Sequence, residues 1–241
     1  TNFILKTMAE KLATLSQESD ISIIKIDDGK ANAFSFDMLS QVNELLSQGP
    51  RDSGGLVITG RDGLFSGGFD LKTMATGDME KITKMVQMGY RLLLELYAFD
   101  RPIIAAVSGH SIALGLFVTC SADYRIAIDG EYICQANEVR NNMDIPTPIM
   151  EILKARVNKN YFYPAVYHSD AYSMKDSIGV GFIDEVVPET EFMNRVMEKA
   201  KELASLPHPF YANTKKSAQE DVRKKISNAI DKYENLTGLK N

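Results

Sequence analysis

Hydrophobic positions in the first half of the chain follow two periods in turn, the alternation of a strand and the three-to-four-residue spacing of a helix. Residues 11–17 and 21–26 carry strand-like patterns on either side of the polar segment 18–20, which predicts a β-hairpin. Ser35 then stands before apolar residues at helical spacing and predicts a capped helix, with its buried side formed by Met38, Leu39, Val42, Leu45 and Leu46. Strands alternating with helices are typical of an α/β fold.

Short apolar runs predict further buried strands over 55–60, 102–107, 124–128 and 132–135. We expect the glycine-rich segment 65–70 to be a loop. It leads into a long helix with Met79, Ile82, Val86, Gly89, Leu93 and Leu96 on one face. Ser108-Gly109-His110 is expected to turn the chain into a helix over 112–121.

From residue 147 onward the pattern changes to short amphipathic helices, expected over 148–157, 161–168, 173–179, 189–206 and from about 211 to the end. A helical tail of this kind either packs on its own domain or joins neighbouring subunits. The chain has no internal repeat, low-complexity segment or flexible linker, so we expect a single structural unit with a helical C-terminal extension.

Composition narrows the class of protein. The 241 residues are 44% hydrophobic and 24% charged, which suits one large domain with a sizeable core. A net charge of −5 argues against a nucleic-acid partner. No apolar run approaches the roughly 18 residues of a membrane span, so we expect no membrane partner. Two cysteines and three histidines are too scattered for a metal site or a disulfide scaffold. Residues 1–12 lack an apolar signal core, and we expect a cytoplasmic protein.

A near match to the G-x-S-x-G nucleophile turn lies at residues 109–113, with Ala113 in place of the last glycine. A serine hydrolase also needs an acid and then a histidine later in the chain, and His208 is the only reasonable late candidate. Since no upstream oxyanion loop of the His-Gly type is present, we favour Ser111 as a helix cap over Ser111 as a nucleophile.

The glycines at 67 and 68 lack the third glycine of a dinucleotide-binding loop, so on their own they indicate a tight turn. The segment 109–113 and the glycines at 67 and 68 are weak signals separately, but together they indicate a common site. Two strand ends, each followed by a small-residue turn that opens into a helix, can point two backbone N–H groups at one place. Such a pair suits the oxyanion that forms during enolisation or acyl transfer.

Five segments occur in the order and spacing of one family: KANAFS at 30–35, FSGGFDL at 65–71, RPIIAAVSG at 101–109, ADYR at 122–125 and GVGFIDEVV at 179–187. On these segments the chain resembles the crotonase (enoyl-CoA hydratase/isomerase) superfamily from about residue 9 to residue 236. The resemblance implies a ββα-spiral core that binds acyl-CoA (1–190) and a helical trimerisation region (191–241), within one structural unit. It implies an acyl-CoA thioester substrate, no cofactor besides the substrate's own coenzyme A, and a homotrimer or dimer of trimers.

Carried over position by position, the resemblance implies an oxyanion hole made by the N–H groups of Gly67 and Leu114. The family usually has glycine at the second position, and the Leu114 side chain is expected to narrow the pocket. The remaining substrate contacts are expected from Ala31, Ala33, Phe34, Gly68, Phe69, Asp70, Leu71, Gly115 and Phe117.

Hydratases of this family use two glutamates, and Phe117 occupies the position of the first. The second position is expected at Glu138. A register one residue earlier places Asn137 there, but the spacing to Ile145-Pro146 favours Glu138. An Asn-Glu pair at this point is similar to the Δ3,Δ2-enoyl-CoA isomerases, in which one glutamate moves a proton from C2 to C4. We expect Phe117 either to desolvate Glu138 and raise its pKa, or to be a plain core aromatic.

The expected activity is therefore the isomerisation of 3-enoyl-CoA to 2-trans-enoyl-CoA, with Glu138 as the proton shuttle. The alternatives are an enoyl-CoA hydratase that uses Glu138 alone and a catalytically weak acyl-CoA-binding protein. Asn141-Asn142 replaces an apolar-glycine pair common in the family, and Asp144 and Thr147 add polarity nearby. These residues either bind a polar substrate or turn the chain.

Overall fold

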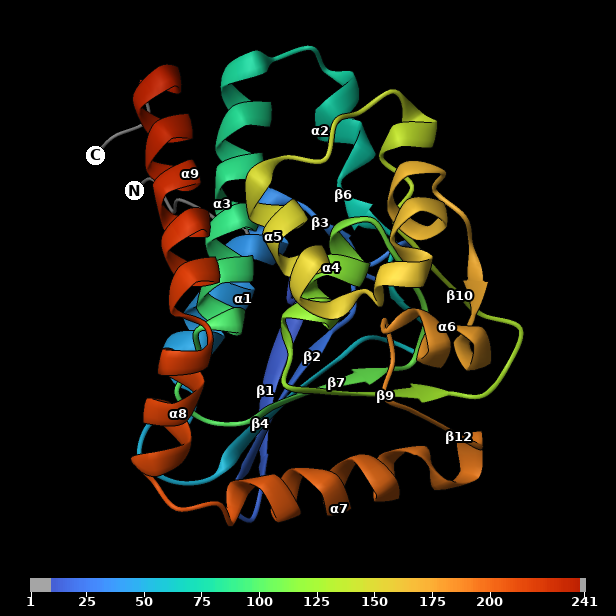
Figure 1. Cartoon of the computed structure of the whole chain (residues 1–241), viewed down its shortest axis with the longest axis vertical. Helices are drawn as coiled ribbons and strands as arrows, with labels where there is room; N and C mark the ends of the chain where they lie inside the picture. The colour runs from blue at the N-terminus through green and yellow to red at the C-terminus, as the bar shows by residue number, and fades with distance from the viewer. Residues whose placement is uncertain (1–9, 239–241) are drawn as a thin grey trace, which may run out of the picture.

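In the computed structural model, which describes residues 10–238, the strands form three sheets (Figure 1). The largest has six strands in the order β1 (Ala13–Glu18), β2 (Ile21–Ile26), β4 (Gly55–Thr59), β7 (Ile103–Val107), β9 (Tyr124–Ile128) and β12 (Glu185–Val187). Only β1 runs antiparallel to its neighbour. A second sheet orders β11 (Tyr172–Ser173), β10 (Ile133–Gln135), β8 (Gly109–Ile112) and β5 (Gly63–Ser66). The third pairs β3 (Ala33–Phe34) with β6 (Gly68–Phe69).

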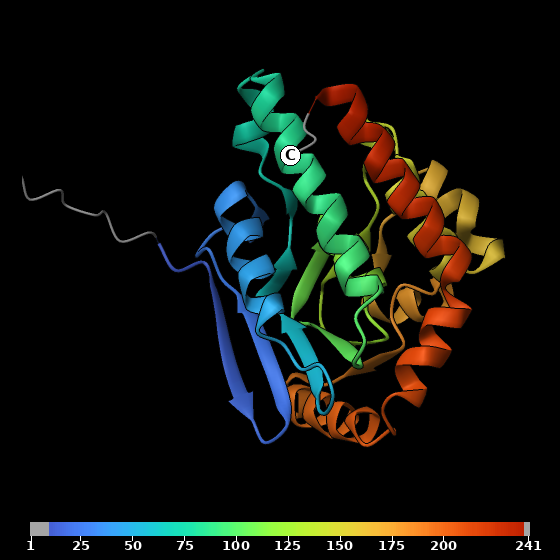
Figure 2. The same ribbon diagram turned by 90° about the vertical axis from the view of Figure 1, so that its left-hand side faces the viewer.

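Helices cover both faces of the six-stranded sheet. Their bounds are α1 (Phe36–Ser47), α2 (Leu71–Ala75), α3 (Met79–Tyr97), α4 (Leu114–Ser121), α5 (Thr147–Arg156), α6 (Met174–Val180), α7 (Phe192–Ala204), α8 (Phe210–Ala218) and α9 (Glu220–Thr237). Single turns lie at η1 (Val139–Asn141), η2 (Lys159–Tyr161), η3 (Tyr163–Tyr167) and η4 (Glu189–Glu191). Helix α7 lies along one side of the sheet, while α3 and α9 run side by side on the other (Figures 1 and 2).

The central strand β7 shows why the sheet must be covered on both faces. Ile103, Ala105 and Val107 belong to the main apolar cluster with α1, α3, α4 and α5. The alternate residues Ile104 and Ala106 belong to a smaller cluster closed by α7. A parallel strand buried on both faces has no polar side, which accounts for its unbroken apolar sequence.

Several predicted elements are confirmed. The predicted hairpin forms, with β1 and β2 paired antiparallel. The Met38 N–H donates a hydrogen bond to Ser35 Oγ (3.2 Å), so Ser35 caps α1. The strands expected at 55–60, 102–107, 124–128 and 132–135 are all present within a residue or two, as are the long helix α3 and the helices α5 and α6.

Other predictions are wrong in an informative way. The expected loop 65–70 contains the end of β5 and all of β6, and the expected helix from 112 begins at Leu114 because 109–112 form β8. The segment expected as a helix at 161–168 is helical, but as a 3-10 turn followed by a π-helix (Tyr163–Tyr167) rather than an α-helix. The expected last helix is two helices that meet at Gln219. The strands β11 and β12 were not expected within the helical region. Each missed strand is at most four residues long and pairs with a distant segment, so local periodicity carries little trace of it.

The C-terminal region divides into two parts. Helix α7 packs on the six-stranded sheet, whereas α9 packs against α3 and α5.

No helix between residues 10 and 238 has both the length and the apolar character to cross a membrane, and the same residues hold no cluster of three potential metal ligands. Most of the segment used for the targeting expectation, residues 1–9, lies outside the described part of the chain.

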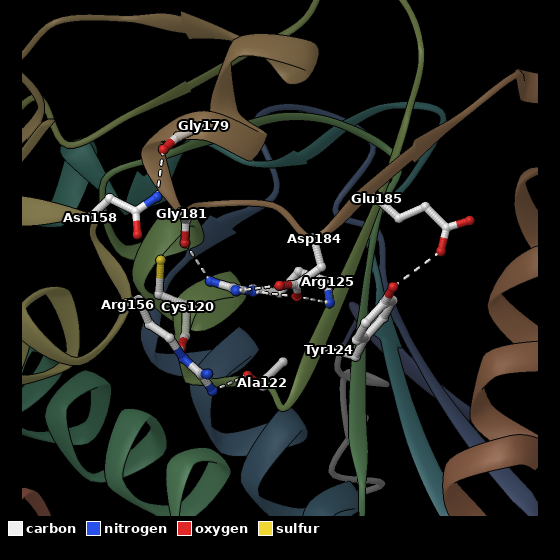
Figure 3. Close-up of polar contacts among 10 residues, drawn as sticks. All are labelled: Cys120, Ala122, Tyr124, Arg125, Arg156, Asn158, Gly179, Gly181, Asp184 and Glu185. Atoms are coloured by element: carbon white, nitrogen blue, oxygen red, sulfur yellow. Dashed lines mark hydrogen bonds and ion pairs between the residues drawn. The ribbon is translucent and has the colours of Figure 1, made fainter. Parts of the chain in front are cut away.

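An ion pair fastens β9 to the chain that leads into β12 (Figure 3). The Arg125 side chain is only 6% exposed. Its Nε and Nη2 donate to the two carboxylate oxygens of Asp184 (2.8 and 2.7 Å), and its Nη1 donates to the Gly181 carbonyl (2.6 Å). Arg156 similarly joins the end of α5 to the carbonyls of Cys120 and Ala122.

We expect Asp184→Ala to lower the free energy of unfolding by about 3–5 kcal/mol, because it leaves a buried guanidinium without its anion. Urea denaturation measures the loss. Glu198→Ala is the matched control, since it removes a carboxylate that is 72% exposed and paired with Arg195. That change is expected to cost no more than about 1 kcal/mol. Equal losses in the two variants would contradict the prediction.

Candidate active site

A cavity of about 310 Å³ opens between α3, the start of α4 and the segment that joins β10 to α5. Its wall is largely apolar, with a few polar groups, as is usual for small-molecule sites. The residues that line it are Gly67, Phe69, Leu71, Met74, Val86, Tyr90, Ala113, Asn137, Glu138, Asn141, Met143, Asp144, Pro146 and Ile149. The arrangement joins a glycine-rich turn, a helix start and a carboxylate from three distant parts of the chain.

The carboxylate is that of Glu138, which immediately precedes the single turn η1. The residue is 7% exposed, and its Oε2 atom is buried without a hydrogen-bond partner among the described residues. Burial raises the pKa of Glu138 to about 7, because the charged form is poorly solvated there. A carboxylate in this state is a base poised to take and return a proton near neutral pH.

The raised pKa also makes stability depend on pH. In the unfolded chain the carboxyl group titrates near its ordinary pKa of 4.5. Between that value and about 7 the folded protein binds more protons, so the contribution of Glu138 to the free energy of unfolding falls as the pH rises, and then levels off.

We expect Glu138→Gln to become more stable relative to wild type as the pH is raised, by about 3 kcal/mol between pH 4 and pH 8. Denaturant unfolding across that range measures the difference. Glu44→Gln, which changes an exposed glutamate of α1, serves as the control. A stability difference that does not change with pH would contradict a buried, titrating Glu138.

The start of α4 supplies a free backbone donor. Leu114 is the first helical residue, so its N–H has no acceptor within the helix, and none of residues 10–238 accepts a hydrogen bond from it. Ala113 precedes it with φ 52° and ψ −127°, a conformation that residues with a side chain rarely adopt. Strain of this kind persists where the surrounding structure needs the geometry.

Gly68 brings β6 against this helix start. Its φ of 102° favours glycine, and a Cβ atom added there would lie 2.8 Å from Ala113 Cβ and 3.4 Å from Leu114 N. Any other residue at position 68 would therefore push the strand away from the donor on Leu114.

The prediction that the Gly67 N–H is the second oxyanion donor is wrong, because that N–H already donates to the Ala31 carbonyl (3.0 Å). The neighbouring geometry favours Phe69. The Asp70 N–H donates to the Phe34 carbonyl of the partner strand (3.3 Å). Since successive N–H groups of a strand point to opposite edges, the Phe69 N–H points away from β3.

The other predicted contact residues divide into two groups. Phe69 and Leu71 line the cavity, Ala31 is exposed on the loop before β3, and Asp70 caps α2. The predicted substrate contacts of Phe34, Phe117 and Gly115 are wrong. Both phenyl rings are fully buried in the core, and Gly115 lies so close to Ser66 that a Cβ atom would clash with it. Neither ring therefore faces the cavity, and Gly115 does not line it.

Because Phe117 lies in the core, the apolar surroundings of Glu138 come from other residues. Met74, Val86 and Ile149 belong to the apolar part of the cavity wall. The alternative interpretation of Phe117, a plain core aromatic, is the one that the structure supports.

Sequence reasoning overlooked Asn32, which organises the loop beneath the site. Its φ is 47°, and it is fully buried. Its side-chain Nδ2 donates to the backbone carbonyls of Ile26, Leu64 and Phe65, and its backbone carbonyl accepts a hydrogen bond from Ser66 Oγ (2.7 Å). The sequence signal was available, because Asn32 is the polar residue between the two alanines of the first family segment.

The structure gives no support to a serine hydrolase. Ser111 is fully buried in β8, with its hydroxyl 2.9 Å from that of Thr119. His208 instead lies 3.8 Å from Asp52. The expectation that Ser111 caps a helix is also wrong, since Ala113 stands at the start of α4 and no side chain caps it.

Comparisons with known proteins agree with this geometry. The family model for enoyl-CoA hydratase/isomerase matches residues 16–237. The solved structure of an enoyl-CoA hydratase, EchA3, from Mycobacterium ulcerans is 33% identical, with a TM-score of 0.87 over 92% of this chain and 98% of that one. An apo structure of the enoyl-CoA isomerase of Mycobacterium tuberculosis is 32% identical, with a TM-score of 0.87 over 92% and 97% of the two chains. These likenesses confirm the expected α/β crotonase-type fold with a helical C-terminal region.

Among curated proteins, human mitochondrial enoyl-CoA delta isomerase 1 is 23% identical over 78% of this chain. The match spans 63% of the length of that human relative. Similar proteins thus carry the names of both a hydratase and an isomerase, so the choice between the two reactions depends on the groups in the cavity.

Proposed function

The chain belongs to the enoyl-CoA hydratase/isomerase family, and from that premise we propose that it converts 3-enoyl-CoA thioesters into 2-trans-enoyl-CoA thioesters. The observation that carries the proposal is a single buried carboxylate, Glu138, in an otherwise largely apolar cavity beside two backbone donors. An isomerase needs one group that both removes and returns a proton, and it gains from a dry site.

In the proposed reaction the N–H groups of Phe69 and Leu114 hold the thioester oxygen. Glu138 takes a proton from C2, and the electron pair of that C–H bond moves into the thioester as a dienolate. The negative charge on oxygen is stabilised by the two N–H groups and the start of α4. The protonated carboxyl group then delivers the same proton to C4, and the double bond moves from C3–C4 to C2–C3.

A second candidate, hydration of 2-enoyl-CoA through Glu138 alone, is favoured by the polar part of the wall. Asn137, Asn141 and Asp144 line the cavity and can hold a water molecule. The two-glutamate route to hydration lacks its first residue here, since the side chain at position 117 is a buried phenyl ring. A catalytically weak acyl-CoA-binding protein is the third reading, and it predicts binding without turnover.

A paired assay separates these candidates. Wild type and Glu138→Gln are each given 3-enoyl-CoA and 2-enoyl-CoA, and isomer and hydration product are measured separately. Conversion of the 3-enoyl substrate without hydration, lost in Glu138→Gln, supports the isomerase. Hydration of 2-enoyl-CoA as the main reaction would support the hydratase instead of the isomerase. Binding of both substrates without conversion of either would support the acyl-CoA-binding protein. The homotrimer or dimer of trimers stays a prediction.

A further inference from the structure

A second hollow, the tail groove, lies beside the cavity that contains Glu138. It has a volume of about 180 Å³ and is lined by residues of α3, α5 and the tail helix α9. Tyr90 of α3 and Pro146, at the start of α5, line both the tail groove and the cavity. These two residues therefore form a partition between the two hollows.

The Tyr90 ring is held in the partition from the side of α9. It is 8% exposed, and the ring of Tyr233 packs edge-on against it, with centroids 5.7 Å apart. The Tyr233 hydroxyl in turn donates to the Thr83 carbonyl of α3 (3.4 Å). A buried ring packed against a second, anchored ring has little room to move aside for a ligand.

The partition belongs to the closed part of the cavity. Leu71 and Met143 also line the cavity, and they are 75% and 37% exposed, so they mark its opening to solvent. Tyr90 and Ile149 are in contrast buried, at 8% and 3%. The charged phosphates of coenzyme A have to stay at the opening, because burying an unpaired ion is costly. The acyl group then extends from the thioester into the closed part.

Tyr90 also lies near the carboxylate that the proposed mechanism uses. Desolvation raises the pKa of the Tyr90 hydroxyl, and the neighbouring Tyr233 and Glu138 add to that rise. Since the proposed function assigns C2 and C4 of the acyl group to Glu138, the carbons beyond C4 are expected next to the Tyr90 ring.

The tail groove has the chemistry to hold a hydrocarbon chain. Its lining includes Pro148 of α5 and Ala229, Tyr233 and Leu236 of α9. Leu236 is 77% exposed, so apolar surface is available along this side of α9. What separates the groove from the cavity is the partition, and Tyr90 is its buried aromatic part.

We propose that Tyr90 limits the length of the acyl group by closing the cavity toward the tail groove. The inference rests on the proposed function, which places the thioester at Phe69 and Leu114 and the next carbons at Glu138. Wild type is then selective for acyl groups that end at the Tyr90 ring, and removal of the ring extends the site along α9.

The test is a binding series with saturated acyl-CoA thioesters, which cannot isomerise, from butanoyl-CoA to dodecanoyl-CoA. In wild type the affinity measured by calorimetry is expected to rise about fourfold for each added methylene group and then to stop rising within the series. Tyr90→Ala joins the two hollows. It is expected to move that break to longer chains and to bind the first thioesters beyond the wild-type break about tenfold tighter than wild type does.

Two control variants separate the partition from other effects. Tyr90→Phe keeps the ring and is expected to keep the wild-type break. Ala229→Phe, added to Tyr90→Ala, refills the tail groove from a residue that does not line the cavity, and it is expected to return the break to the wild-type length. If Tyr90→Ala does not fold, Tyr90→Val removes less volume and takes its place.

An affinity that rises through the whole series in wild type would overturn the inference without any variant. So would a break that stays in place when a folded variant lacks the Tyr90 ring, or a gain that survives Ala229→Phe. Failure of the proposed function shows separately, as absent conversion of 3-enoyl-CoA by wild type.

Discussion

Replacing Glu138 with glutamine is expected to lower kcat for the isomerisation of 3-enoyl-CoA by about 10³- to 10⁴-fold. The amide has nearly the shape of the carboxyl group but cannot accept a proton from C2. The other polar side chains of the wall are the amides of Asn137 and Asn141, which are poor bases, and the exposed carboxylate of Asp144, which lacks the buried position of Glu138. We therefore expect no neighbour to replace Glu138. The residual rate is the part supplied by binding and by the two backbone donors. Stopped-flow or continuous absorbance assays of the conjugated product measure kcat directly.

Binding separates a chemical effect from a structural one. Glu138→Gln is expected to bind a saturated acyl-CoA within a few-fold of wild type, because the substitution preserves side-chain volume and removes a poorly solvated charge. Glu138→Asp keeps a carboxylate but shortens its reach, and its kcat is expected to lie between those of wild type and Glu138→Gln. A glutamine variant that retains more than a tenth of the wild-type kcat would refute Glu138 as the proton shuttle.

The backbone donor on α4 can be tested by deleting a single N–H. Leu114 is the first residue of the helix, a position at which proline is tolerated because its missing N–H is not used by the helix. Leu114→Pro is therefore expected to lower kcat by about 10²- to 10³-fold through the loss of one oxyanion donor.

Leu114→Ala is the control, since it also removes the buried leucine side chain but keeps the N–H. Both variants are expected to lose about 2–5 kcal/mol of stability from the cavity that they create. The comparison is made at a temperature where both are folded, as judged by circular dichroism. If alanine and proline lower kcat equally, the side chain and not the N–H group is responsible.

The elements that the sequence predicts best are those fixed by local chemistry. Ser35 predicts the start of α1, because its side-chain oxygen can accept a hydrogen bond from the Met38 N–H wherever the helix lies in the fold. The apolar run of β7 indicates burial on both faces, and the structure provides it. Glu138 could be placed through the resemblance because a specific Asn-Glu pair marks its position.

The errors concern properties that arise between distant segments. Gly67 lies in a glycine-rich segment typical of an oxyanion turn. Its N–H, however, donates a hydrogen bond to the Ala31 carbonyl, thirty-six residues earlier in the chain. Phe117 lies three residues beyond the free donor on Leu114, and the rotation of the helix turns its ring into the core. Tyr90 was hidden within an amphipathic pattern, since periodicity shows that a helix face is buried but not which of its residues line a cavity.

The packing of α9 against α3 and α5 has an evolutionary consequence. Tyr90 comes from α3 and Ile149 from α5, so the tail helix supports the two helices that shape the cavity, and its Tyr233 contacts the Tyr90 ring. Substitutions in the tail can therefore alter which acyl group is accepted without changing any residue that touches it. Lineages of this family could diverge in substrate choice through drift in a helix that lies far from Glu138 in the sequence.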